Sequence, residues 1–150
     1  MTRRLERSVD RPAASAHHYL PLRIHSSSAR LLLVFSVVAI AVLTLTPAAD
    51  ERHRPPFWCF SCGDRVANDM FLNVLLFIPL GAALGLLRVR ALGAAAMGFF
   101  LSTAVELLQY GIPGREPSAR DVLTNTIGTI LGAWIASAFF HSGRAVRAVR

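Results

Sequence analysis

Four long apolar runs dominate this chain of 150 residues and restrict the folds open to it. The runs cover residues 29–46, 70–87, 91–110 and 122–140, so each contains 18 to 20 residues. An α-helix needs about 20 residues to cross the hydrocarbon core of a bilayer. Runs of this length with almost no charge are typical of transmembrane helices. The sequence therefore predicts an all-α, polytopic membrane protein, a bundle of four transmembrane helices.

A soluble bundle of unusually apolar helices is the alternative fold. Helices of such a bundle would keep a polar stripe along one face, with a period of about 3.6 residues. The first run contains only four polar residues, Arg30, Ser36, Thr44 and Thr46, and they form no stripe. This pattern favours the membrane fold.

The runs divide the chain into three parts. Residues 1–28 are polar and rich in arginine, which is typical of a disordered tail. Residues 29–140 form the transmembrane domain, and residues 141–150 form a short basic tail. The first run is long for the apolar part of a signal peptide and follows a long tail, so an uncleaved anchor is favoured over cleavage near Ala48.

The arginines predict how the chain is oriented in the membrane. All 16 basic residues are arginine, a pattern that suggests a GC-rich bacterial genome. If both termini are cytoplasmic, the two tails and the turn at 88–90 hold 11 arginines, whereas the loops at 48–69 and 111–121 hold five. Cytoplasmic segments carry the excess of positive charge. We therefore expect a multi-pass protein of the bacterial plasma membrane with cytoplasmic N- and C-termini.

The net charge of +7 raises the question of nucleic-acid binding. Sites for single strands combine a basic groove with aromatic side chains on which bases stack. The arginines of this chain gather in the tails without interleaved aromatic residues. The sequence therefore predicts membrane lipids as partners and no nucleic acid.

Polar side chains from three runs are expected at one depth of the bilayer. Asn73, Glu106, Gln109 and Asn125 each lie near the outer end of a run, within about 6 Å of its boundary at 1.5 Å of rise per residue. Ionisable residues inside a membrane are functional by default. Polar residues of the adjoining loop complete the predicted ligand-binding site, which consists of Asn73, Glu106, Gln109, Arg115, Arg120, Asp121 and Asn125.

The spacing within the third run orients part of this site. Ser102, Glu106 and Gln109 are separated by four and three residues and therefore share one helix face. A carboxylate at Glu106 should face the bundle with a cationic partner, for which Arg115 and Arg120 are the candidates. The alternative is structural, because such polar groups also form hydrogen bonds between helices. For Asp121, a helix N-cap is an equally good interpretation.

Two pairs of glycines predict where helices approach closely. Gly81 with Gly85, and Gly128 with Gly132, are separated by four residues in the second and fourth runs. Small residues at this spacing let the backbones of two membrane helices come together. We therefore expect close packing along these faces.

Cys59 and Cys62 lie in the first predicted outer loop, in the sequence Trp-Cys-Phe-Ser-Cys-Gly. A disulfide suits an oxidising outer compartment. A zinc site would need four ligands, and only His53 lies nearby, so no metal is predicted. A thioredoxin-like redox pair would need a βαβ context that is absent from the sequence. Free thiols remain a further alternative.

Two motifs resemble those of the VanZ-like membrane protein family. The first is Asn-Val-Leu-Leu-Phe-Ile-Pro-Leu-Gly at residues 73–81. The second lies within residues 102–132 and combines Glu106-x-x-Gln109, Pro-Gly-Arg at 113–115 and Asp121-x-x-x-Asn125-x-x-Gly128. The resemblance implies an integral membrane protein whose namesake is linked to low-level resistance to the glycopeptide teicoplanin. It implies no settled reaction.

The function expected from these observations is binding or modulation of a cell-envelope lipid or precursor at the outer leaflet. The ligand expected for Arg115 and Arg120 is an anionic headgroup of such a lipid or precursor. The alternatives are a membrane-embedded enzyme with Glu106 as general acid or base, and a structural scaffold. Ser102 lies one turn deeper without a histidine beside it, so we assign no catalytic residue and expect no cofactor.

Overall fold

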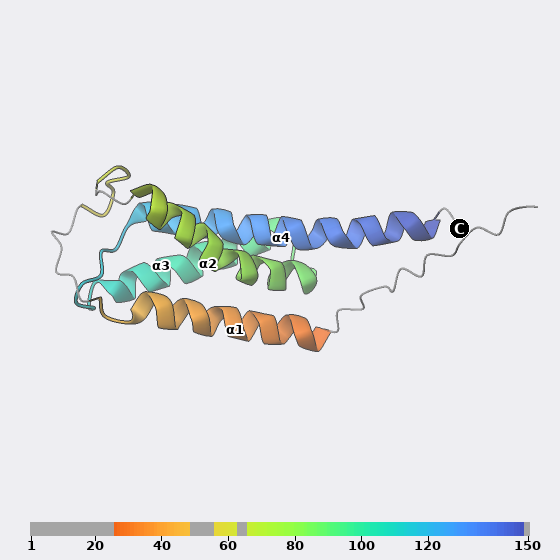
Figure 1. Cartoon of the computed structure of the whole chain (residues 1–150), viewed down its shortest axis with the longest axis horizontal. Coiled ribbons are helices and arrows are strands. Elements are labelled where there is room, and N and C mark those ends of the chain that lie inside the picture. The colour runs from red at the N-terminus through yellow and green to blue at the C-terminus, as the bar shows by residue number, and fades with distance from the viewer. Residues whose placement is uncertain (1–25, 49–55, 63–65, 149–150) are drawn as a thin grey trace, which may run out of the picture.

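The computed structural model describes residues 26–48, 56–62 and 66–148. All regular structure in these ranges is helical (Figure 1). The helices are α1 (Ser26–Leu45), α2 (Val66–Leu86), α3 (Ala91–Gln109) and α4 (Ala119–Ala148). Each contains a segment long and apolar enough to cross a membrane. The prediction of an all-α protein with four membrane-spanning helices is confirmed.

The helices extend beyond the apolar runs at several ends. α2 begins at Val66, four residues before the predicted run, and α1 begins at Ser26, inside the expected N-terminal tail. α4 continues to Ala148, so most of the predicted C-terminal tail belongs to this helix. A helix can continue past the end of an apolar run, because its backbone hydrogen bonds do not require apolar side chains. The polar side chains at its ends can reach water. The predicted disorder of residues 1–25 lies outside the described residues.

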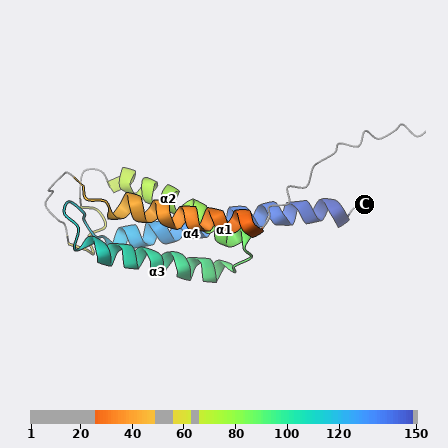
Figure 2. The same ribbon diagram turned by 90° about the horizontal axis from the view of Figure 1, so that it is seen from below.

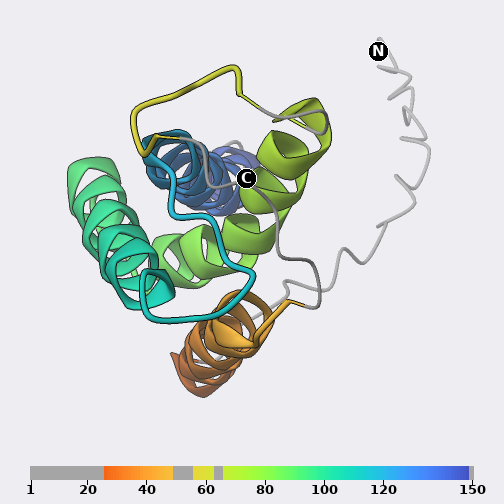
Figure 3. The ribbon, with the colours of Figure 1, turned by 90° about the vertical axis from the view of Figure 1, so that its left-hand side faces the viewer.

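The connecting segments gather at the two ends of the bundle. Residues 46–48, 56–62 and 110–118 lie together at one end, which we call the loop end (Figures 1 and 3). The α2–α3 turn lies at the opposite end, with the start of α1 and the end of α4. Figure 2 shows that α4 projects beyond the other three helices at that end.

α2 and α4 form the closest helix pair of the bundle. Their glycines allow this packing, because a Cβ atom at Gly81 would collide with the carbonyl oxygen of Thr129. A Cβ at Gly128 would collide with the Val74 carbonyl, and one at Gly132 with the Ile78 carbonyl. The predicted close approach at the glycine pairs is confirmed.

α1 has a more peripheral position than the other helices. It packs on α2 and α3 and, within the described part of the chain, makes no contact with α4 (Figure 3). Ile40 joins α1 to the buried core cluster, which also contains Phe77, Leu80, Leu84, Ala94, Val105 and Ala133. The remaining faces of α1 are largely exposed.

The bundle exposes many large apolar side chains and buries several polar ones beside its apolar core. Leu31, Phe100 and Phe139 are each at least 70% exposed, whereas Ser102 and Thr129 are fully buried. A soluble protein rarely exposes so continuous an apolar surface. The exposed apolar belt is the surface that a membrane helix presents to lipid, and it argues against the soluble alternative.

Candidate functional site

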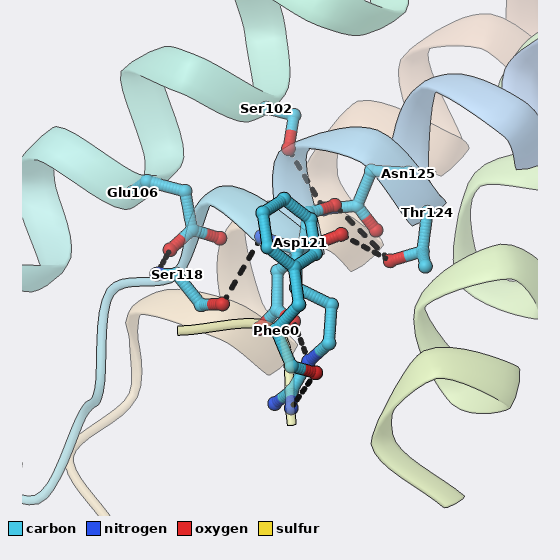
Figure 4. Close-up of polar contacts among 8 residues, drawn as sticks. Phe60, Ser102, Glu106, Ser118, Asp121, Thr124 and Asn125 are labelled. Atoms are coloured by element: carbon cyan, nitrogen blue, oxygen red, sulfur yellow. Dashed lines mark hydrogen bonds and ion pairs between the residues drawn. The ribbon is translucent and has the colours of Figure 1, made fainter. Parts of the chain in front are cut away.

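The N-terminus of α4 is the centre around which the polar side chains gather (Figure 4). Ser118 precedes the helix and its carbonyl accepts the N–H groups of Asp121 and Val122. Its hydroxyl accepts the N–H of Arg120 at 3.2 Å. Ser118 is therefore the N-cap of α4, because its side-chain oxygen satisfies an N–H of the first turn.

Glu106 of α3 supplies the carboxylate that completes this cap. Its Oε2 atom accepts the backbone N–H of Ser118 at 2.7 Å, and both groups are buried. In a capping box, an acidic residue three positions after the N-cap accepts this N–H. Here a residue of another helix occupies that role, which leaves Asp121, the residue at the third position, free to make other contacts.

Two expectations about these carboxylates are wrong. Glu106 binds a backbone N–H and forms no ion pair with Arg115 or Arg120 among the described residues. Asp121 lies inside the first turn of α4, and the N-cap is Ser118. The unsatisfied N–H groups at the start of a buried helix need an acceptor, and Glu106 lies where it can supply one.

Asp121 forms polar contacts with two neighbours. Its carboxylate pairs with Nε of Arg120 at 3.4 Å, and the side chain of Asn73 on α2 lies close to it. A second guanidinium nitrogen of Arg120 donates to the carbonyl of Phe60 at 3.3 Å. Arg120 therefore connects the start of α4 to the segment that follows α1.

The segment at residues 56–62 covers this end of α4. Cys59 and Cys62 are joined by a disulfide, with 5.7 Å between their Cα atoms. The carbonyl of Phe57 accepts the N–H of Ala119 at 2.9 Å, and the Phe57 ring lies 6.5 Å from that of Tyr110. The segment at residues 56–62 thus supplies two backbone acceptors, the Phe57 and Phe60 carbonyls, to the first turn of α4.

Asn125 lies one turn deeper along α4 and has one unpaired atom. Its side-chain Nδ2 donates to the hydroxyl of Ser102 on α3 at 2.8 Å. The side chain is only 2% exposed, and its Oδ1 atom is buried without a hydrogen-bond partner. Buried polar atoms are nearly always paired, so an isolated acceptor requires an explanation.

Gln109 and Arg115 attach the C-terminal end of α1 to this cluster. Gln109 Nε2 donates to the Thr44 carbonyl at 2.9 Å. Arg115 donates from Nε to the Thr46 carbonyl at 2.8 Å and from a terminal nitrogen to the Leu43 carbonyl at 2.6 Å. These carbonyls end a helix and lack intrahelical donors, so the two side chains act as its C-terminal cap.

A cavity of about 930 Å³ opens among these groups. All seven residues of the predicted site line it, so the structure brings the whole set together: Asn73, Glu106, Gln109, Arg115, Arg120, Asp121 and Asn125. Asn68, Asp69 and Glu116 also line it and were not predicted. Asn68 and Asp69 precede the second apolar run, so the apolar pattern does not place them in a helix. They line the cavity because α2 begins before the run and includes them in its first turn.

The other part of the cavity wall is apolar. α1 contributes Phe35, Ala39 and Leu43, and α2 contributes mainly Leu72, Leu75, Leu76 and Pro79. Leu43 on α1 and Leu72 on α2 are both more than half exposed. The cavity is therefore polar near the loop end and apolar between α1 and α2, where lining side chains also reach the outer surface.

Comparison with known proteins identifies the family of the chain. A model of the VanZ/LLP1 family matches residues 20–140, which include all four candidate spans and every residue of the cavity lining. The chain belongs to the VanZ/LLP1 family. Neither the curated proteins nor the solved structures give a match. With its four apolar helices, this VanZ-like chain is a multi-pass membrane protein.

Metal binding finds no support in the described ranges. No group of three His, Cys, Asp or Glu side chains is placed there to hold a metal ion. His53, the additional ligand considered for the cysteine pair, lies outside the described residues.

Proposed function

We propose that this VanZ-like protein binds a membrane lipid or a lipid-linked envelope precursor in the cavity at its loop end. The observation that carries the proposal is the division of one cavity wall into a polar and an apolar part. Amphipathic molecules have the same division between headgroup and chains. Ligand sites in proteins commonly enclose about 300–1,000 Å³, and this cavity lies within that range.

The dimensions of the apolar part support a lipid as the ligand. The lining residues of α1 extend from Phe35 to Thr44, which is about 13 Å along a helix at 1.5 Å per residue. This distance accommodates the upper part of an acyl chain beside α1 and α2. Exposed lining residues on both helices allow the rest of the chain to remain in the bilayer.

We infer the side of the membrane from the arginines. Placing the 11 arginines of the tails and the α2–α3 turn in the cytoplasm directs the loop end outward. The ligand would then come from the outer leaflet of a bacterial plasma membrane. By binding such a ligand, the protein would act at the cell envelope and in glycopeptide resistance. Glycopeptide resistance is the property linked to the namesake of the family.

A pair of neighbouring substitutions on α1 tests the proposal. Ala39 lines the cavity, whereas Val38 does not and is 54% exposed. Ala39→Phe should fill the apolar part of the cavity, and Val38→Phe should leave it open. Native mass spectrometry of the purified proteins should show copurified lipid on the wild type and on Val38→Phe, with strongly reduced occupancy on Ala39→Phe. Equal lipid occupancy on all three proteins would refute binding in this cavity.

A further inference from the structure

The cavity lining combines four acidic side chains, two arginines and one buried acceptor without a partner, and this composition indicates the chemistry of its ligand. We propose that the bound headgroup presents a primary ammonium group, as in a zwitterionic aminophospholipid, and that purely anionic headgroups are disfavoured. The inference depends on the proposed lipid-binding function and specifies which class of lipid the cavity selects.

The first observation is the charge of the lining. All four acidic residues in the described part of the chain line this one cavity: Asp69, Glu106, Glu116 and Asp121. Arg115 and Arg120 are the two basic residues of the lining. Carboxylates thus outnumber guanidinium groups by four to two. An anionic headgroup placed among them would meet like charges, which disfavour its binding.

The second observation is that both guanidinium groups already have protein partners. Arg115 donates to two carbonyls at the end of α1, and Arg120 donates to Asp121 and to the Phe60 carbonyl. Each therefore has a structural role in holding the loop end together. Their positive charge nevertheless remains beside the cavity, so it can balance the phosphate of a zwitterionic lipid while carboxylates attract the amine.

The third observation is the unpaired acceptor on Asn125. Its Oδ1 atom is buried in a side chain that lines the cavity and has no partner in the protein. An unpaired buried acceptor is costly, and a ligand that donates a hydrogen bond to it removes that cost. A primary ammonium group has three N–H donors and no acceptor, so it can serve a carboxylate and this carbonyl together.

Lipids with matched acyl chains separate the possible outcomes. The full-length protein in detergent should be titrated with phosphatidylethanolamine, phosphatidylcholine and phosphatidylglycerol, and binding followed by native mass spectrometry. We expect phosphatidylethanolamine to bind about tenfold more tightly than either of the others, the effect of one charge-assisted hydrogen bond. Tighter binding of phosphatidylglycerol would overturn the headgroup assignment while leaving lipid binding intact.

Two further results would also overturn it. Phosphatidylcholine has a positive charge without N–H donors. If it binds as tightly as phosphatidylethanolamine, hydrogen bonds from an ammonium group do not determine the selectivity. Soluble glycerophosphoethanolamine that binds as tightly as the lipid would show that the ligand is a free headgroup. If none of the three lipids binds, the proposed function itself fails.

Substitutions in the protein test the same inference independently. The combined change Asp69→Asn and Glu106→Gln replaces two carboxyl groups by amides while keeping side-chain size, and it should lower the preference for phosphatidylethanolamine about tenfold. Arg90→Gln, at the opposite end of the bundle and outside the cavity lining, is the control and should keep the preference. Thermal unfolding of each variant verifies that it is folded. An unchanged preference in a folded double variant would refute the role of the carboxylates.

Discussion

The carboxylate of Glu106 on α3 accepts the backbone N–H of Ser118, the N-cap residue of α4, at 2.7 Å. The same side chain lines the cavity at the loop end. One residue therefore joins two helices and contributes to the candidate site. Substitutions that keep or remove its acceptor atoms can separate these two roles.

Glu106→Leu should destabilise the protein, whereas Glu106→Gln should retain most of its stability. Glutamine keeps a carbonyl oxygen that can accept the Ser118 N–H, but leucine leaves that buried donor unpaired. The cost of an unpaired buried group is about 1–3 kcal/mol. Thermal unfolding in detergent measures the difference, with Leu107→Ala on the exposed side of α3 as the control. A Glu106→Leu protein as stable as the wild type would contradict the capping role.

If the carboxylate also binds ligand, Glu106→Gln should fold normally and lose activity. A complementation assay measures this loss: the variant gene is tested for its ability to restore the phenotype that the wild-type gene confers. Full activity of Glu106→Gln would mean that the charge of Glu106 is dispensable and that its role is structural.

Gly81→Ala should disrupt the packing of α2 on α4, because the new Cβ would collide with the backbone carbonyl of Thr129. Neither backbone can shift without moving a helix, so a loss of about 1–3 kcal/mol is expected. Gly111→Ala is a matched control, since its Cβ would meet only the Leu108 carbonyl at an ordinary 3.7 Å. Folded yield and thermal unfolding report the effect. Equal yields for the two variants would argue against close packing at Gly81.

Arg115→Met should loosen the C-terminal end of α1. The substitution removes the hydrogen bonds to the Leu43 and Thr46 carbonyls while keeping a long side chain. Hydrogen exchange in peptides covering residues 43–48 should accelerate at least about tenfold. Arg90→Met should leave this exchange unchanged. Unaltered exchange in Arg115→Met would show that other contacts hold this end of α1.

Cys59 and Cys62 should resist thiol reagents in membranes isolated under alkylating conditions. The structure joins them in a disulfide, and an outer compartment lacks the reducing pool of the cytosol. Labelling should appear only after reduction, and the double variant with both cysteines changed to serine should never be labelled. Complete labelling without reduction would rule out a stable disulfide.

Reporter fusions can establish the orientation that the arginines predict. Fusions after residue 89 and at residue 150 should report the cytoplasm, and those at residues 55 and 116 should report the outside, because of the 11-to-5 division of arginines. A cytoplasmic signal at 116 would place the cavity in the inner leaflet and would transfer the proposed ligand to that side.

The sequence predicts the number and type of helices because each apolar run is long enough to decide it. The shared location of Asn73, Glu106 and Asn125 is also predictable, since their depth follows from position within a run. The start of α4 is harder to predict. Asp121, directly before the apolar run, matches an N-cap as well as Ser118 three residues earlier does, and the hydrogen bonds of the structure distinguish them.

The partners of these side chains depend on tertiary structure. Charge alone favours an arginine as the partner of Glu106, yet a backbone N–H of another helix has that position. The contacts of Gln109 and Arg115 with α1 connect residues more than 60 positions apart in sequence. Such contacts follow from how the helices cross, and the spacing of Gln109 and Arg115 does not reveal which carbonyls of α1 they reach.

The length of α4 has a consequence for the depth of the cavity. The apolar part of the helix, Ala119–Phe139, has 21 residues and spans about 31 Å, close to the thickness of the hydrocarbon core. If this part fills the hydrocarbon core, the start of α4 beside the carboxylates stands at the level of the phospholipid headgroups. On the proposed function, a lipid that enters sideways between α1 and α2 would keep its depth in the bilayer. It avoids the transfer of its chains into water, which would cost about 0.8 kcal/mol for each methylene.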